Sequence, residues 1–238
     1  MKAKVELYLA VVAIATFALG TTVEAEEFDP CSLLSNPAMR EQLSSALETK
    51  LMMLCGEITQ AEVHQRQTTI IDDAVVDDPG LDIRVNDPAL DVGGTTQSET
   101  SVVAVDSTVC AAFNDSGEGF RTSVFNGLSG FGFSNDGGLT FIDGGPFPNG
   151  PGPDRNFGDP SLAFSVRDNA FYYAALSTVG LSLWKSTDNC QSFRYVGRIH
   201  AGGGDDKELM AIDNNPTSPF YGRIYVGWTN FALANNIN

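Results

Sequence analysis

Positive charge is scarce in this chain, which has 14 Lys and Arg against 30 Asp and Glu and a formal net charge of −16. A surface of this sign repels phosphate backbones and anionic lipid headgroups. The composition therefore disfavours nucleic-acid binding and attachment to a membrane surface. By itself, the acidic excess indicates solubility.

Histidine and the common nucleophile motifs are also scarce. His64 and His200 are isolated, and neither has the spacing to cysteine that a zinc site needs. The sequence has no Gly-x-Ser-x-Gly turn and no glycine-rich phosphate-binding loop. We therefore assign no catalytic residue and no metal ligand from motifs.

Only one apolar run approaches the length of a membrane span, and it lies at the N-terminus. Residues 7–20 follow Lys2 and Lys4 and precede a short Val-Glu-Ala stretch at 23–25. A membrane anchor is the alternative, but the run is shorter than the ~20 residues that a spanning helix needs. The order of these features is typical of a secretion signal. We expect residues 1–25 to be a signal peptide and the mature protein to be secreted or periplasmic.

Two octapeptides that begin at Ser134 and Ser186, 52 residues apart, share the pattern S-x-D-x-x-x-[T/S]-F. Two glycines in the first copy supply the positive-φ positions of a tight turn between antiparallel strands. The Asp can accept hydrogen bonds from backbone N–H groups of the turn, and the Phe is expected to anchor it in the core. In the second copy Cys190 replaces a glycine, so that turn must manage its backbone strain differently. The expected structural residues are Ser134, Asp136, Gly138, Thr140, Phe141, Ser186, Asp188, Ser192 and Phe193.

The octapeptide resembles the Asp-box, or bacterial neuraminidase repeat, of the sialidase-like superfamily. The first copy matches S-x-D-x-G-x-T-[FWY] at every constrained position, and the second departs from it at the glycine. In that family the box joins the third and fourth strands of each blade of a β-propeller. The resemblance therefore implies Asp-box propeller blades over residues 99–238.

Three runs at 99–106, 159–164 and 206–213 each precede a second apolar strand and are predicted to be inner strands of successive blades. The predicted fold class is all-β, a partial β-propeller of about two and a half four-stranded blades. Propellers typically close with ~4–8 blades, and open edges expose unpaired backbone. We therefore expect an incomplete ring: the N-terminal part of a longer protein, or a truncated product.

Before the blades, residues 26–71 are predicted to form a short helical segment. Leu43, Leu47, Leu51 and Leu54 share one helical face, with a start at residues 36–37 and a stop or break at Gly56. Helix is predicted to resume over 57–67 on this pattern, and residues 72–98 are predicted to be an acidic linker. The linker lacks the alternating oxygen ligands and the closing Glu of a calcium-binding loop. We therefore expect no cofactor, and bound calcium is the alternative.

Four cysteines in an exported chain are candidates for disulfides, and three connectivities are possible. Cys31–Cys55 requires a helix break, because a straight helix over 37–55 would be ~27 Å long at ~1.5 Å per residue. Cys110–Cys190 would cross-link two blades. Buried free thiols are the alternative.

Acidic residues stand at the start of each predicted inner strand: Glu99, Asp159, and Asp206 with Glu208. Inner strands line the central channel, so these side chains would gather around one of its mouths. We interpret them as an acidic axial pocket for a cation, a metal or a polyhydroxyl ligand. The alternative is that they cap strand starts or bond to the backbone of neighbouring blades.

A sialidase, by the resemblance, would use an arginine cluster, a tyrosine–glutamate pair and an aspartate. Its first arginine belongs to an Arg-Ile-Pro element on the first inner strand, where this chain has residues 99–102 without an arginine; Arg121, Arg155 and Arg194 match no family motif.

The favoured function is an exported propeller that binds a glycan or an extracellular protein through its axial face. The alternatives are the N-terminal part of a sialidase-type glycoside hydrolase and a remnant without activity.

Overall fold

The computed structural model describes residues 29–59, 83–89, 97–115 and 127–234. Within these ranges the chain forms two four-stranded antiparallel sheets and one two-stranded sheet. The first sheet contains β1 (Gln97–Val105), β2 (Thr108–Asp115), β3 (Ser129–Ser134) and β4 (Ile142–Pro146). The second contains β5 (Ser161–Ser165), β6 (Ala170–Ser177), β7 (Gly180–Ser186) and β8 (Arg194–Ala201). The third contains β9 (Asp205–Ile212) and β10 (Ile224–Asn230), followed by the short helix α6 (Phe231–Ala234).

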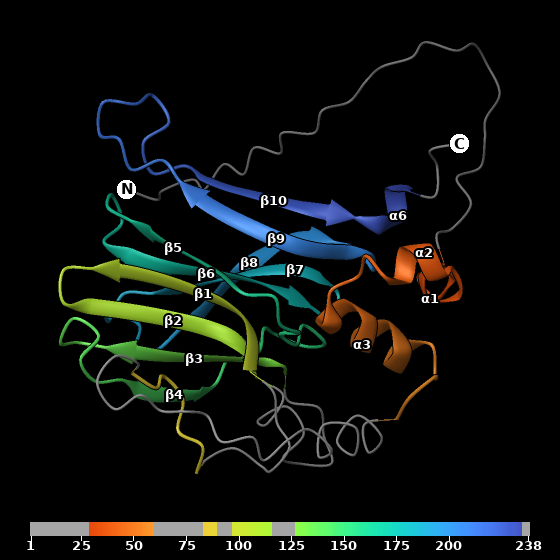
Figure 1. The fold of residues 1–238 in the computed structure, drawn as a ribbon. Helices are drawn as coiled ribbons and strands as arrows, with labels where there is room; N and C mark the ends of the chain where they lie inside the picture. The colour runs from red at the N-terminus through yellow and green to blue at the C-terminus, as the bar shows by residue number, and fades with distance from the viewer. Residues whose placement is uncertain (1–28, 60–82, 90–96, 116–126, 235–238) are drawn as a thin grey trace.

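Each sheet is a simple meander in which consecutive strands are neighbours. The first strands of the three sheets lie side by side, because β1 contacts β5 and β5 contacts β9. Figure 1 shows the sheets stacked, the third over the second and the second over the first. Four-stranded meanders that repeat around their first strands are the architecture of a β-propeller. This part of the chain is a partial β-propeller, which confirms the predicted fold class.

The second sheet is buried on both faces. All eight residues of β6 are buried, and neighbours such as Tyr172 and Tyr173 face opposite sides because side chains alternate along a strand. Tyr173 packs between the first and second sheets, where its ring stacks on Phe147 with centroids 3.7 Å apart. Tyr172 belongs to the cluster that meets the third sheet. The side chains of β6 therefore contribute to two apolar interfaces, one with the first sheet and one with the third.

The first octapeptide forms a hydrogen-bonded turn between β3 and β4. Ser134 Oγ donates to Asp136 Oδ1 at 2.7 Å, and the backbone N–H of Gly138 donates back to Ser134 Oγ at 2.9 Å. Thr140 donates to both carboxylate oxygens, from its N–H at 3.0 Å and its hydroxyl at 2.6 Å. The hydroxyls of Ser134 and then Thr140 hold the pKa of Asp136 below its usual range.

The second octapeptide makes the same bonds between β7 and β8. Asp188 accepts from the Ser186 hydroxyl at 2.7 Å and from the Ser192 N–H at 3.0 Å, and Cys190 N–H donates to Ser186 Oγ at 3.0 Å. The backbone remains left-handed without glycine, since φ is 58° at Asn189 and 62° at Cys190. In the second turn, two residues with side chains therefore adopt the left-handed backbone conformation that two glycines adopt in the first turn.

The two Phe anchors differ. Phe193 is 8% exposed and packs against Phe131 and Phe147 between the first and second sheets. Phe141 is only partly buried and lies outside the core clusters, so the prediction that it re-enters the core is wrong.

The helical segment is broken into α1 (Ser32–Ser35), α2 (Pro37–Arg40) and α3 (Ser45–Leu54). Asn36 caps α2, accepting from the N–H groups of Ala38 and Met39, so the predicted start at 36–37 is confirmed. Leu47 and Leu51 are fully buried, but Leu43 precedes α3 and Leu54 is 62% exposed. The prediction that the four leucines share one face of a helix is therefore wrong for Leu43, and Leu54 does not pack in the core. Helix α3 ends at Leu54, and Ile58, on the turn that follows, fills the core instead.

All four cysteines are paired, as Cys31–Cys55 and Cys110–Cys190. The free-thiol alternative is wrong, and the breaks between the helices provide the chain reversal that the first bond requires. The second bond joins β2 of the first sheet to the β7–β8 turn of the second. Two disulfides indicate an oxidising, extracellular or periplasmic compartment.

Several predictions fall outside the described residues: the signal peptide at 1–25, most of the continuation at 57–67 and most of the linker at 72–98. The described piece at 83–89 lies against the first sheet, where Asp87 N–H donates to Asp143 Oδ2 at 2.7 Å. The predicted domain boundaries stay predictions. Among the helices that the structure describes, none is long and apolar enough to cross a membrane.

The two octapeptide turns provide a matched test of stability. Asp188→Ala removes a carboxylate whose turn holds buried Phe193 and the disulfide residue Cys190, and we expect it to lower the free energy of unfolding by about 1–3 kcal/mol. Asp136→Ala should cost less, because Phe141 is not in the core. Urea unfolding of both variants measures the difference, and an equal or larger loss in Asp136→Ala would contradict this account.

Candidate functional site

Three charged residues have a left-handed backbone at corresponding points near the start of the inner strands. The angle φ is 50° at Glu99, 50° at Asp159 and 55° at Lys207. A residue with a β-carbon is less stable there by about 1–2 kcal/mol. At each of these three positions the chain has a charged residue where glycine would relieve the backbone strain. Such strain is typical of functional sites.

Hydrogen bonds between sheets establish that these points correspond. Ser101 Oγ, two residues after Glu99, accepts from Leu162 N–H at 3.0 Å. Ser161 Oγ, two residues after Asp159, accepts from Met210 N–H at 2.9 Å. Each inner strand is therefore bonded to the next in the same register.

The three left-handed residues converge. Lys207 Nζ lies 3.2 Å from Glu99 Oε2, although the first and third sheets contribute them. Asp159, from the sheet between, is positioned by Asn114: its N–H donates to Asn114 Oδ1 at 2.6 Å, and its Oδ1 accepts from Asn114 Nδ2 at 3.2 Å. Glu99 and Lys207 are 25% and 49% exposed and form the outer rim, and Asp159 is buried behind them.

Two further carboxyl groups come from β9. Asp206 is fully buried and accepts two hydrogen bonds from Ser44, from its N–H at 2.8 Å and its hydroxyl at 2.5 Å. Ser44 is the N-cap residue of α3, so the carboxylate lies at a helix N-terminus, where negative charge is favoured. Glu208 is 3% exposed, and neither of its carboxyl oxygens accepts a hydrogen bond from any described residue.

Burial and crowding raise the pKa of two of these groups. Burial, and then a hydrogen bond with the Glu99 carboxyl that requires a shared proton, raise the pKa of Asp159 to about 8. Burial, and then the charges of Asp159 and Asp206, raise the pKa of Glu208 well above its usual value. Asp159 is therefore protonated at neutral pH.

Glu99, Asp159, Asp206 and Glu208 all lie near the start of the inner strands. The residue of the third strand that corresponds to Glu99 and Asp159 is Lys207, and the predicted Asp206 and Glu208 lie on either side of it. We call these four residues the axial acidic site. The alternative role, bonding to a neighbouring blade, holds in part for Asp159, through Asn114 of the first sheet. Ligand binding by the four carboxyl groups stays a prediction.

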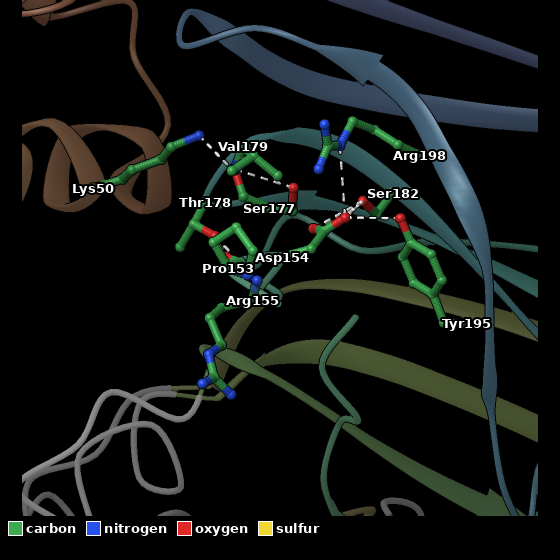
Figure 2. A network of polar contacts seen from close by, with 10 residues as sticks. All are labelled: Lys50, Pro153, Asp154, Arg155, Ser177, Thr178, Val179, Ser182, Tyr195 and Arg198. Carbon is green, nitrogen blue, oxygen red and sulfur yellow. Dashed lines mark hydrogen bonds and ion pairs between the residues drawn. The ribbon is translucent and has the colours of Figure 1, made fainter. Parts of the chain in front are cut away.

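Several residues around the site were missed by sequence reasoning. Lys50 of α3 is 1% exposed and donates from Nζ to Ser177 O at 2.7 Å, at the end of β6 (Figure 2). A usable signal existed, because Lys50 lies three residues after buried Leu47 and so on the apolar face of the helix. Ser44 and Asn114 have no comparable signal, since each matters only through a partner far along the chain.

Two other buried carboxylates beside the site are fully supplied with donors. Asp154 accepts from the Ser182 hydroxyl at 2.9 Å and the Tyr195 hydroxyl at 2.8 Å, with Arg198 Nε 3.7 Å away (Figure 2). Asp205 accepts from side-chain nitrogens of His200, Trp228 and Asn230 at 2.7, 3.1 and 2.9 Å. Within the described ranges, no three His, Cys, Asp or Glu side chains are arranged to hold a metal ion.

Comparison with known proteins gives a distant likeness. No protein-family model and no curated protein matches the chain. Similar solved structures include an exo-β-1,3-galactanase from Phanerochaete chrysosporium with β-1,3-galactotriose, at 15% identity and a TM-score of 0.41 over 61% of this chain and 35% of that one. Another is a putative glycosidase from Bacteroides thetaiotaomicron, at 17% identity and a TM-score of 0.40 over 66% and 53%. A third is a GH43_12 protein retrieved from a capybara gut metagenome, at 16% identity and a TM-score of 0.40 over 68% and 32%.

The chain thus spans about a third to a half of the length of these structures. At these identities and TM-scores the likeness carries no argument about substrate or mechanism. None of the three is described as a sialidase, so the sialidase-like resemblance rests on the octapeptides alone.

The raised pKa of Asp159 predicts a pH-dependent stability. The folded chain keeps this proton up to about pH 8, whereas the unfolded chain loses it near 3.8, so the folded state binds more protons in between. The contribution of Asp159 to the free energy of unfolding therefore falls as pH rises from about 4 to 8. The groups that face it are Glu99, Ser44, Asp206, Lys207 and Glu208.

Asp159→Asn should remove this contribution. Urea unfolding of the wild type and the variant at several values between pH 4 and 8 should show the variant gaining relative stability as pH rises. A constant difference across this range would contradict the assignment.

Proposed function

We propose that this protein is an exported propeller module that binds a carbohydrate at the axial acidic site. The observation that carries the proposal is the Glu208 carboxyl, which is 3% exposed and receives no hydrogen bond from a described residue. Leaving a buried polar group unsatisfied costs about 1–3 kcal/mol, and more for a charged one. A ligand that donates hydrogen bonds to Glu208 would offset this cost.

Carbohydrate hydroxyl groups suit such a site. Each hydroxyl both donates and accepts, so it can bond to a carboxylate, which accepts only, or to a protonated carboxyl, which donates. The exposed rim formed by Glu99 and Lys207 offers an approach from solvent, with Asp159 buried behind it. The two disulfides agree with a protein that meets its ligand outside the cytoplasm.

Isosteric substitutions test the proposal. Glu208→Gln and Asp159→Asn keep the shape of the side chain and change its hydrogen bonding and charge. Each should weaken binding to a neutral oligosaccharide selected from a glycan array by at least about tenfold, the usual scale for a lost buried hydrogen bond. Titration calorimetry on the full chain measures the affinity.

Asp136→Asn is the control, because its exposed turn lies between β3 and β4, away from the start of the inner strands. It should bind like the wild type. If Glu208→Gln and Asp159→Asn also bind like the wild type, the axial acidic site is not the binding site.

A second candidate is glycoside hydrolysis, and one observation favours it. With its pKa raised to about 8, Asp159 is protonated at neutral pH and lies beside the Glu99 carboxyl, with which it can share its proton. A carboxylic acid that is protonated at neutral pH can act as the general acid that protonates the departing oxygen of a glycosidic bond. The missing Arg-Ile-Pro element makes a sialidase the less favoured type.

Fluorogenic methylumbelliferyl glycosides distinguish the two candidates. Turnover of a neutral glycoside that is lost in Asp159→Asn and retained in Asp136→Asn would establish hydrolysis. Binding without turnover would leave the binding module. Turnover of the sialoside would restore the sialidase type and overturn our leading choice.

A further inference from the structure

The stack of three sheets ends in two open faces, and both expose large apolar side chains. On the third sheet Leu209 is 76% exposed and Tyr225 is 41% exposed, and on the first sheet Val102 is 65% exposed. Figure 1 shows these two sheets at opposite ends of the stack. Contiguous apolar surface that stays exposed is typical of a site that meets a partner.

Strand pairing extends each of these faces over two strands. Directly paired residues of neighbouring strands lie on the same face of a sheet. The outer face of the first sheet therefore contains four apolar residues: Val102, Ala104, Val109 and Ala111. That of the third sheet contains Leu209, Ala211, Tyr225 and Gly227. None of these positions carries a charge, although the chain is strongly acidic.

The contacts inside the chain show how one sheet receives the next. In each case the second residue after the left-handed position of one inner strand meets the third residue after that of the following strand. Ser101 Oγ accepts from Leu162 N–H at 3.0 Å, and Ser161 Oγ accepts from Met210 N–H at 2.9 Å. The side chains of Leu162 and Met210 pack in the apolar clusters between these sheets. The same register therefore joins both pairs of sheets.

Leu209 and Val102 occupy the next two positions of this series, at the ends of the stack. Leu209 is the second residue after Lys207, where the other two inner strands have serine, and Val102 is the third residue after Glu99. A second copy that continued the stack would bring its Val102 against Leu209. An apolar contact would then replace the hydrogen bond from an N–H to a serine that the two inner interfaces use.

We propose that two copies of this chain close one ring, in which the third sheet of each copy packs on the first sheet of the other. The described residues of each copy supply three sheets. Propellers close with ~4–8 blades, so two copies fit this range, whereas one or three do not. The ring has two-fold symmetry and two identical interfaces, with Leu209 of each copy against the partner's Val102. Dimerisation does not depend on what the axial acidic site binds.

Sedimentation equilibrium of the full chain tests the ring, and we expect a particle of twice the chain mass. Leu209→Glu and Val102→Lys should each raise the dissociation constant of the dimer by at least about a hundredfold, because each leaves an unpaired charge buried in both interfaces. Leu139→Glu is the control. Leu139 is 72% exposed, as Leu209 is nearly, but it lies in the turn between β3 and β4, so this variant should stay dimeric.

Opposite charges should restore the dimer. In the double variant L209E/V102K, each glutamate faces a lysine of the other copy at both interfaces. An equal mixture of the two single variants has the charge pair at one interface and Leu209 against Val102 at the other. Both samples should regain twice the chain mass, whereas a dimer formed through any other pair of surfaces would show no such rescue.

Three results overturn the proposal: a wild type of single-chain mass at millimolar concentration, a dimer that Leu209→Glu leaves intact, and a dimer that is lost in both single variants and regained in neither combination. Far-UV circular dichroism shows whether each variant folds. If a charged variant does not fold, Leu209→Cys combined with Val102→Cys decides. We then expect oxidation to link two chains through these positions, and chains that stay unlinked contradict the ring.

Discussion

The burial of carboxyl groups where three inner strands begin is the constraint that organises this end of the molecule, because a buried charge must receive donors, a counter-charge or a proton. The fold uses all three solutions. Asp154 and Asp205 receive side-chain donors within and between strands, and Asp206 receives the N-cap residue of α3. Asp159 and Glu208 receive too few donors, and burial raises the pKa of both groups. Some of these carboxylates are therefore fully hydrogen-bonded within the fold, whereas Asp159 Oδ2 and both oxygens of Glu208 receive no hydrogen bond from a described residue.

The helical segment and the sheets depend on each other at this end. Helix α3 packs on the second sheet through Leu47 and Leu51. Its N-cap residue Ser44 donates to the Asp206 carboxylate, and Lys50 donates to the backbone oxygen of Ser177. Short helices of this kind are marginal alone. Packing on the sheets and the Cys31–Cys55 bond stabilise them, so a segment outside the propeller repeat becomes part of its axial face.

The octapeptide turns and the axial acidic site have separate roles. The turns join the third and fourth strands, far from the start of the inner strands, and their carboxylates are occupied by local hydroxyl and N–H donors. They stabilise the blades and provide no free chemistry. A likeness based on these turns therefore describes architecture, and function has to be argued from the residues at the opposite ends of the strands.

Features governed by neighbours in the chain were readable from the sequence. The octapeptide turns, the strands on either side of them, the cap at Asn36 and the acidic residues at the strand starts all depend on spacing over a few residues, and the structure has them where predicted. The sequence also stated the condition for Cys31–Cys55, a helix break, without choosing the pairing. The choice of pairing, the exposure of Leu54, the half-buried Phe141 and the burial of Lys50 were decided by tertiary structure. The physical reason is that local hydrogen bonds are encoded in contiguous residues, whereas burial, and with it the charge state of Asp159 and Glu208, depends on groups brought together from distant parts of the chain.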